Sequence, residues 1–145
     1  MAAAKEERPL CCYTVSVRTS STPAAGTNAR VSVELRSAGG EKATLALRES
    51  INHGRPFESG RTDVFFFPGR PWLGELQQLR VWHDNCAPSA GWHLDCVEVH
   101  DSNTDIVSFF PCDRWLASDR DDGQTERLLH CTKRRVKQPR FMRQR

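Results

Sequence analysis

The sequence predicts an all-β domain, a sandwich or a barrel built from about eight short strands. Two observations support this prediction. Short runs alternate apolar and polar residues with the period of two that a half-buried strand has, and segments rich in turn-forming residues separate them. No segment shows a long helical period. With 145 residues, 38% of them hydrophobic, the chain is long enough to bury a core as one domain.

The expected strands follow one another at short, regular intervals. In chain order they are residues 13–19, 29–37, 43–49, 62–67, 75–83, 92–100, 105–110 and 126–131. The first run places Tyr13, Val15 and Val17 on one face, and the second does the same with Val31 and Val33. The third alternates through its leucines, and the later runs follow between turn segments such as SAGGEK and FPGRPWLG.

The order of strands also predicts which loops meet. If each strand crosses the domain once and the next one returns, alternate connections lie at the same end. The loops expected at one end are 20–28, 49–61, 84–91 and 111–124, and those at the other are 37–42, 68–74 and 101–104. The first end gathers side chains with oxygen atoms, among them Thr27, Asn28, Glu49, Asn52, Glu58, Asp84, Asn85, Asp119, Asp121 and Asp122. Such a composition suits calcium, which takes about 6–8 oxygen ligands from flexible loops.

Charge is distributed unevenly along the chain. Residues 132–145 hold seven basic residues and no acidic one, so removing them from the net charge of +3 leaves −4 for the rest. A basic tail of this kind favours a polyanionic partner, such as anionic lipid or an acidic protein surface. A solvated end without a partner is the alternative interpretation.

Cysteine spacing and the N-terminus indicate the compartment. The six cysteines include no C-x-x-C pair, so we expect free thiols, mostly buried as small apolar groups. No stretch is apolar enough to span a membrane, and the start lacks the apolar core of a secretory signal. These features predict a cytoplasmic protein.

Six segments, in this order and spacing, resemble a known family. They are GTNARVSVEL (26–35), FESGRTDVFFF (57–67), LGELQQLRVWHDN (73–85), GWHLDCVEVHD (91–101), FFPCDRWL (109–116) and DDGQTERLL (121–129). Together they are similar to the polycystin–lipoxygenase–alpha-toxin domain, also called the lipoxygenase homology or PLAT domain. The resemblance implies an antiparallel β-sandwich of two four-stranded sheets that docks an attached protein onto membrane or protein, often with calcium. It divides the chain into an N-terminal extension (1–11), a PLAT domain (12–131) and a basic tail (132–145).

The resemblance also implies where calcium would bind, and the sequence departs from it there. Relatives that bind calcium usually carry Gly-Thr-Asp in the first loop, where this chain has Asn28 after Thr27. At a second family site Asn-Asp precedes Phe-Glu, and of the acidic residues in that motif this chain keeps only Glu58. Asp84 and Asn85 match the family corner. The loss of carboxylates should weaken binding, so we expect weak calcium at most, with Thr27, Asn28, Glu58, Asp84 and Asn85 as its ligands. The alternative is that Asp84 and Asn85 only cap the end of a strand.

Lipid contact can be judged from the aromatic residues. The tips SSTPAAG and NCAPSAG have none, while Trp115 matches a family position that can face lipid. Electrostatic adsorption through the tail would use its basic side chains. Together with Trp115 the candidate contacts are Lys133, Arg134, Arg135, Lys137, Arg140, Arg143 and Arg145.

Catalysis is not expected. The sequence contains no serine nucleophile elbow, phosphate loop or H-E-x-x-H motif. His83 beside Asp84 could suggest a base and its orienting carboxylate, but neighbours in a strand point to opposite faces.

The sequence therefore predicts a non-catalytic adaptor or scaffold that needs no cofactor and contacts acidic proteins ahead of anionic lipid. By analogy with the family, a ciliary or axonemal setting with microtubules as a partner surface, or the cytoplasmic face of a membrane, is expected. A calcium-responsive lipid-binding module is the alternative. Nucleic acid is not expected as a partner, because only Phe141 in the tail could stack on a base.

Overall fold

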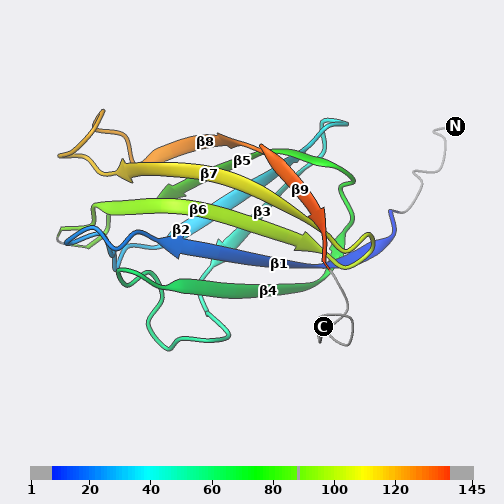
Figure 1. The fold of residues 1–145 in the computed structure, drawn as a ribbon, viewed down its shortest axis with the longest axis horizontal. Coiled ribbons are helices and arrows are strands. Elements are labelled where there is room, and N and C mark those ends of the chain that lie inside the picture. The colour runs from blue at the N-terminus through cyan, green and yellow to red at the C-terminus, as the bar shows by residue number, and fades with distance from the viewer. Residues whose placement is uncertain (1–7, 88, 138–145) are drawn as a thin grey trace, which may run out of the picture.

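A computed structural model describes residues 8–87 and 89–137 as nine strands in two antiparallel sheets (Figure 1). The strands are β1 (Leu10–Thr19), β2 (Val31–Ser37), β3 (Lys42–Leu47), β4 (Thr62–Pro71), β5 (Leu76–His83), β6 (Trp92–Asp101), β7 (Ile106–Leu116), β8 (Glu126–His130) and β9 (Lys133–Val136). The five-stranded sheet has the order β4-β1-β6-β7-β9, and the four-stranded sheet has the order β3-β2-β5-β8. The predicted antiparallel sandwich is confirmed.

The core lies between the two sheets and explains the period-two pattern. Every second residue of β1 is buried, and β2 alternates in the same way. Val15 pairs with Phe65 on one side and with Val99 on the other, so all three side chains point into the same layer. The opposite sheet matches it with Val33 beside Val81. Each buried aliphatic or aromatic side chain stabilises the fold by about 1.5–3 kcal/mol.

The sequence predicted two four-stranded sheets, but β9 adds a fifth strand to one of them. β9 lies inside the segment expected to be a free basic tail. Its residues pair with β7 from Phe109–Lys133 to Ile106–Val136, yet all four of its side chains are exposed. An edge strand held by backbone pairing and polar side-chain contacts has no apolar alternation, which is why the sequence pattern did not reveal it.

Two further boundaries differ from the sequence expectation. β1 begins at Leu10, inside the expected N-terminal extension. β7 continues to Leu116, through much of the segment expected to be a loop, and its pairing with β6 shifts register between Leu94 and Cys96. Such a bulge lets a strand continue where its alternation breaks.

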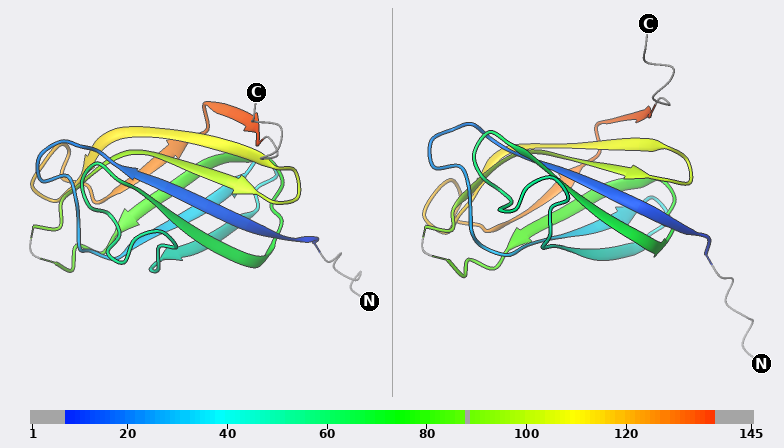
Figure 2. Two further views of the ribbon diagram at one scale, coloured as in Figure 1. Left: turned by 60° about the horizontal axis from the view of Figure 1, so that its bottom comes forward. Right: turned by 90° about the horizontal axis from the view of Figure 1, so that it is seen from below.

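The predicted meeting of alternate loops is confirmed. Loops 20–30, 48–61, 84–91 and 117–125 form one end of the sandwich, which we call the first pole (left in Figure 1). There the Thr27 amide donates to the Phe57 carbonyl at 3.0 Å, and the Asp84 amide donates to the Arg30 carbonyl at 3.1 Å. Loops 38–41, 72–75 and 102–105 form the opposite end, and the two further views show the same division (Figure 2).

The six cysteines are free thiols, but the expectation that most are buried is wrong: only Cys11 is buried, Cys86 is exposed, and the other four are half-buried. Burial raises the pKa of Cys96 and of Cys112 to about 11, so both remain protonated and weakly nucleophilic at neutral pH. Across residues 8–87 and 89–137, no helix is long and apolar enough to cross a membrane.

Tyr13 links the core to the end of the sandwich opposite the first pole. Its ring is fully buried, and its hydroxyl accepts a hydrogen bond from the Leu73 amide at 2.9 Å. Burial raises the pKa of Tyr13 above its ordinary value, so the hydroxyl stays neutral. The amide at Leu73 has its partner only because this hydroxyl is present at the edge of the core.

We expect Tyr13→Phe to lower the free energy of unfolding by about 1–3 kcal/mol, because it leaves the buried Leu73 amide without an acceptor. Urea denaturation followed by tryptophan fluorescence measures the change. Thr14→Val, one residue along on the outer face, is the control and should change stability by less than about 0.5 kcal/mol. Equal stability of Tyr13→Phe and the wild type would contradict this account of the bond.

Candidate functional site

The Asp84–Asn85 corner is held by local hydrogen bonds. Oδ1 of Asp84 accepts from the Arg30 amide at 3.0 Å and from the Cys86 amide at 3.2 Å. Hydrogen bonds from the Cys86 side chain and from these two amides hold the pKa of Asp84 below its ordinary value. Asn85 has a φ of +53°, a left-handed conformation that asparagine tolerates. These bonds match the strand-capping alternative drawn from the sequence.

His83 is a structural residue of the same corner. The side chain is only 3% exposed. Its Nε2 donates to the Leu116 carbonyl at 2.7 Å, and its Nδ1 accepts from the Asn85 amide at 3.0 Å. The carbonyl and the amide together select the neutral Nε2–H tautomer. Both ring nitrogens are therefore engaged: Nε2 joins β5 to β7, and Nδ1 holds the corner at Asn85.

The other expected calcium ligands are divided between roles. Thr27 is buried, and its hydroxyl donates to the Ala90 carbonyl at 2.7 Å while accepting from the Ala29 amide at 3.1 Å. Glu58 is exposed and lies 3.5 Å from Arg61. Asn28 is exposed at the rim of a pocket that neither Glu58 nor Asp84 lines.

The buried carboxylate Asp63 positions loop 48–61. Its Oδ2 accepts from the Phe57 amide at 2.8 Å, and its Oδ1 lies 2.9 Å from Nδ1 of His53. These bonds hold Phe57 at a φ of +65°, which is strained for a bulky residue. Gly26 of the neighbouring loop approaches so closely that a β-carbon there would lie 2.7 Å from the Phe57 carbonyl oxygen. The two loops are thus fixed against each other.

A pocket of about 250 Å³ lies between these two loops, and we call it the arginine pocket. It is lined by Thr27, Asn28, Ala29, Arg30, Leu47, Arg48, Gly54, Arg55, Pro56 and Phe57. Three of these residues are arginines, and none is a carboxylate. The sequence signal was the exchange of family ligands at Asn28 and at Arg55-Pro56, where relatives carry Asn-Asp, but Arg48 had no such mark.

The expected calcium ligands are divided at this pole, because Thr27 and Asn28 line the arginine pocket and Glu58, Asp84 and Asn85 do not. Within the described part of the chain, no group of three or more His, Cys, Asp or Glu side chains is arranged to hold a metal. The Thr27 hydroxyl and one oxygen of Asp84 already have partners, and the pocket between the loops carries arginines. Calcium binding by Thr27, Asn28, Glu58, Asp84 and Asn85 stays a prediction.

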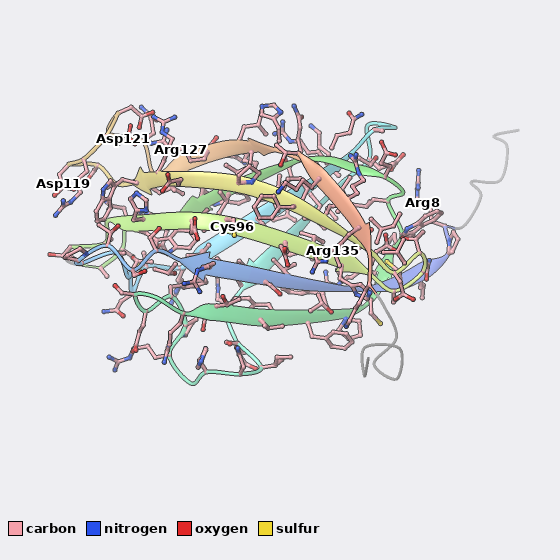
Figure 3. The ribbon with its side chains drawn as sticks, viewed as in Figure 1. Arg8, Cys96, Asp119, Asp121, Arg127 and Arg135 are labelled. Carbon is pink, nitrogen blue, oxygen red and sulfur yellow. The ribbon has the colours of Figure 1, made fainter. Side chains whose placement is uncertain are left out.

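Two of the acidic residues of loop 117–125, Asp121 and Asp122, pair with arginine. Arg127 of β8 is 8% exposed and donates to both carboxylate oxygens of Asp122, at 2.5 and 2.7 Å, and to the Trp115 carbonyl at 2.7 Å. Arg114 of β7 pairs with Asp121 at 2.7 Å. Asp121, Asp119 and Arg127 lie together at the first pole (Figure 3). This cluster closes the loop onto the sheet.

Trp115, expected to face lipid, is half-buried among side chains. The His93 ring meets it edge-on with centroids 5.1 Å apart, and the Arg120 guanidinium lies 4.4 Å above it. His93 in turn lies 2.6 Å from the Ser20 hydroxyl. The indole is therefore covered on the protein and not presented on a loop tip.

The basic side chains expected to contact a partner point to two different sides of β9. Register places Lys133 beside Phe109 and Arg135 beside Val107 on the outer face of the five-stranded sheet. Arg134 points the other way and donates to the Leu76 carbonyl at 2.5 Å. Lys137 follows the strand. Arg140, Arg143 and Arg145 lie outside the described residues.

A hollow on this outer face was not expected from the sequence. It measures about 540 Å³ and is lined by Thr14, Ser16, Glu98, His100, Val107, Arg135, Val136 and Lys137. We call it the outer-face hollow. Its floor includes the small side chains Thr14 and Ser16 of β1, which the sequence marked only as the polar face of a strand. Arg135 lies above the sheet beside β9 (Figure 3), 3.3 Å from Glu98.

The fold and the corner residues define a class of protein. Residues 13–130 match the PLAT/LH2 domain, so the chain belongs to that family. It is 44% identical over 124 residues to human lipoxygenase homology domain-containing protein 1, covering 86% of this chain and 6% of that protein. It is 35% identical over 104 residues to mouse polycystin-1-like protein 3, covering 65% of this chain and 5% of that protein.

Solved structures agree with the fold. The crystal structure of coral 8R-lipoxygenase, described as activated by calcium via a C2-like domain, superposes with a TM-score of 0.68 at 26% identity. The match covers 83% of this chain and 17% of the lipoxygenase. The chain thus corresponds to a small part of each of these proteins.

We expect acid to weaken the loop closure made by Asp122. The Arg127 guanidinium holds the pKa of Asp122 well below its ordinary value, so the stabilisation is present above about pH 4 and is lost as pH falls further. Urea denaturation at pH 7 and pH 3 should show a larger loss of stability for the wild type than for Asp122→Asn. Asp119→Asn on the same loop is the control and should behave like the wild type. An equal pH dependence in all three proteins would contradict this role.

Proposed function

We propose that this chain is a non-catalytic docking module that contacts an acidic protein surface through the basic side of the outer-face hollow. The supporting observation is that β9 aligns Lys133 and Arg135 on one face, with Lys137 following, beside a hollow of about 540 Å³. Exposed cations beside a concave surface favour an acidic partner that fills the hollow.

The arrangement supports protein contact ahead of lipid contact. Trp115 is covered by His93 and Arg120, so no indole is available there to enter a lipid interface. The hollow also offers varied groups, including His100 and the apolar Val107 and Val136. Such a mixture suits the polar and apolar groups of a protein better than a uniform layer of headgroups.

The histidine contacts support a role without catalysis. His83 uses both ring nitrogens in the core, His53 lies against the buried Asp63, and His100 lies 2.9 Å from Asp105. Each of these rings is engaged in a contact that joins structural elements. An adaptor or scaffold function follows from this proposal, and an axonemal setting, with the acidic surface of a microtubule as partner, stays a prediction.

The calcium-responsive lipid module remains the alternative. It draws on the likeness to coral 8R-lipoxygenase, and the geometry of the first pole gives it less support. The two proposals differ in a simple way, since protein docking through β9 requires no calcium.

We expect the triple variant Lys133→Glu, Arg135→Glu, Lys137→Glu to weaken co-sedimentation with microtubules at least about tenfold, a change of about 1.4 kcal/mol. Reversed charges repel an acidic surface, and the effect should shrink as salt rises. The matched control reverses Arg36, Lys42 and Arg70 to Glu, away from the hollow, and should keep most of the binding.

The same proteins are tested with vesicles of phosphatidylcholine and phosphatidylserine, with calcium or chelator. Calcium-dependent vesicle binding without microtubule binding would replace the proposal by its alternative. Point variants are preferable to deletion of residues 132–145, because deletion would also remove β9 from its sheet. A melt of each variant verifies the fold.

A further inference from the structure

We propose that the arginine pocket of the first pole binds a phosphate monoester group, and that this oxyanion occupies the region where relatives would hold a cation. The proposal is independent of the docking function, because the pocket and β9 use different residues of the molecule.

The charge of the pocket is one-sided. Arg30, Arg48 and Arg55 line it, and no aspartate or glutamate does. Asn28 adds a side-chain amide at the rim. Arginine suits phosphate because its planar guanidinium donates two parallel hydrogen bonds to two oxygen atoms and stays charged at any physiological pH.

These three arginines differ from the others within residues 8–87 and 89–137. Elsewhere in that range each arginine either pairs with a carboxylate or lies over an aromatic ring. The paired ones are Arg8, Arg18, Arg36, Arg61, Arg80, Arg114, Arg127, Arg134 and Arg135, and the stacked ones are Arg70 and Arg120. No carboxylate lines the concavity that holds these three cations, although the charge of Arg30 helps to lower the pKa of Asp84 outside it. The excess of positive charge favours an external anion.

The backbone of the pocket walls and the side chain of Arg48 are held in place before any ligand arrives. The Thr27 amide bonds to the Phe57 carbonyl, and Gly26 permits the close approach of the two loops. Asp63 holds the strained Phe57, and one guanidinium nitrogen of Arg48 donates to the Val31 carbonyl at 2.7 Å. Strain retained at a pocket wall is typical of functional sites. Preorganisation reduces the entropy cost of binding a small ion.

The pocket volume sets the size of the ligand. About 250 Å³ is below the range of drug-sized sites, so the pocket accommodates a single phosphate group with its nearest substituent. Such a group can belong to a free phosphate ester or to a lipid headgroup. Glycerol 3-phosphate and phosphatidic acid carry the same phosphate monoester in the two settings, and they serve as the two probes.

The test has two parts. The full chain is titrated with glycerol 3-phosphate while its amide NMR shifts are monitored. Its flotation with phosphatidylcholine vesicles is then compared with and without phosphatidic acid. We expect the shifts to centre on residues 27–30 and 54–57. The variant Arg30→Gln, Arg48→Gln, Arg55→Gln should bind the probe at least about tenfold more weakly. The control Arg36→Gln, Lys42→Gln, Arg70→Gln removes the same charge elsewhere and should bind like the wild type.

The outcomes separate cleanly. Binding of glycerol 3-phosphate identifies a soluble ligand, and binding only to vesicles with phosphatidic acid identifies a lipid headgroup. Either kind of binding supports the site if the pocket variant loses it. Equal weakening in the control variant, or no response to either probe, overturns it. If the triple variant does not fold, the single variant Arg55→Gln replaces it. The Arg55 side chain makes no hydrogen bond within the described residues, so this change should leave the fold intact. It should weaken binding of the probe about threefold.

Discussion

The close packing of the two inner sheet faces is the constraint on which the rest of the structure depends. Val15, Val33, Val81 and Val99 meet in one layer, and moving any strand by one residue would turn its apolar side outward. Register is therefore fixed throughout the sandwich. Fixed register makes alternate loops return to the same pole, and it leaves the loops and the outer sheet faces to carry function.

At the first pole, acidic side chains serve mainly the fold. Asp63 supports the strained Phe57, Asp84 caps its strand through the Arg30 and Cys86 amides, and Asp122 closes its loop onto Arg127. A carboxylate with these partners is less available to an external cation, because binding would first break hydrogen bonds already made. The pocket between the loops is correspondingly cationic. We propose, as the central claim, that this pole belongs to a calcium-independent module.

The strands and the meeting of loops could be predicted because both follow from alternation, which the core enforces directly. β9 could not, since its residues Lys133–Val136 are exposed and are held by the backbone of β7 and by polar side-chain contacts, none of which leaves an apolar alternation. Trp115 was expected to face lipid, but its exposure depends on His93 and Arg120, which lie on other segments. The arginine pocket was missed for the same reason: Arg30, Arg48 and Arg55 each resemble a solvated residue until the fold unites them.

The most direct test of the central claim is a thermal melt of the full chain in about 1 mM calcium against chelator, a concentration that saturates all but the weakest protein sites. Asp84→Ala is measured beside the wild type. The account predicts the same melting temperature for the wild type with and without calcium, since a cation that does not bind the native state does not stabilise it. A calcium-dependent rise in the wild type that Asp84→Ala abolishes would contradict it.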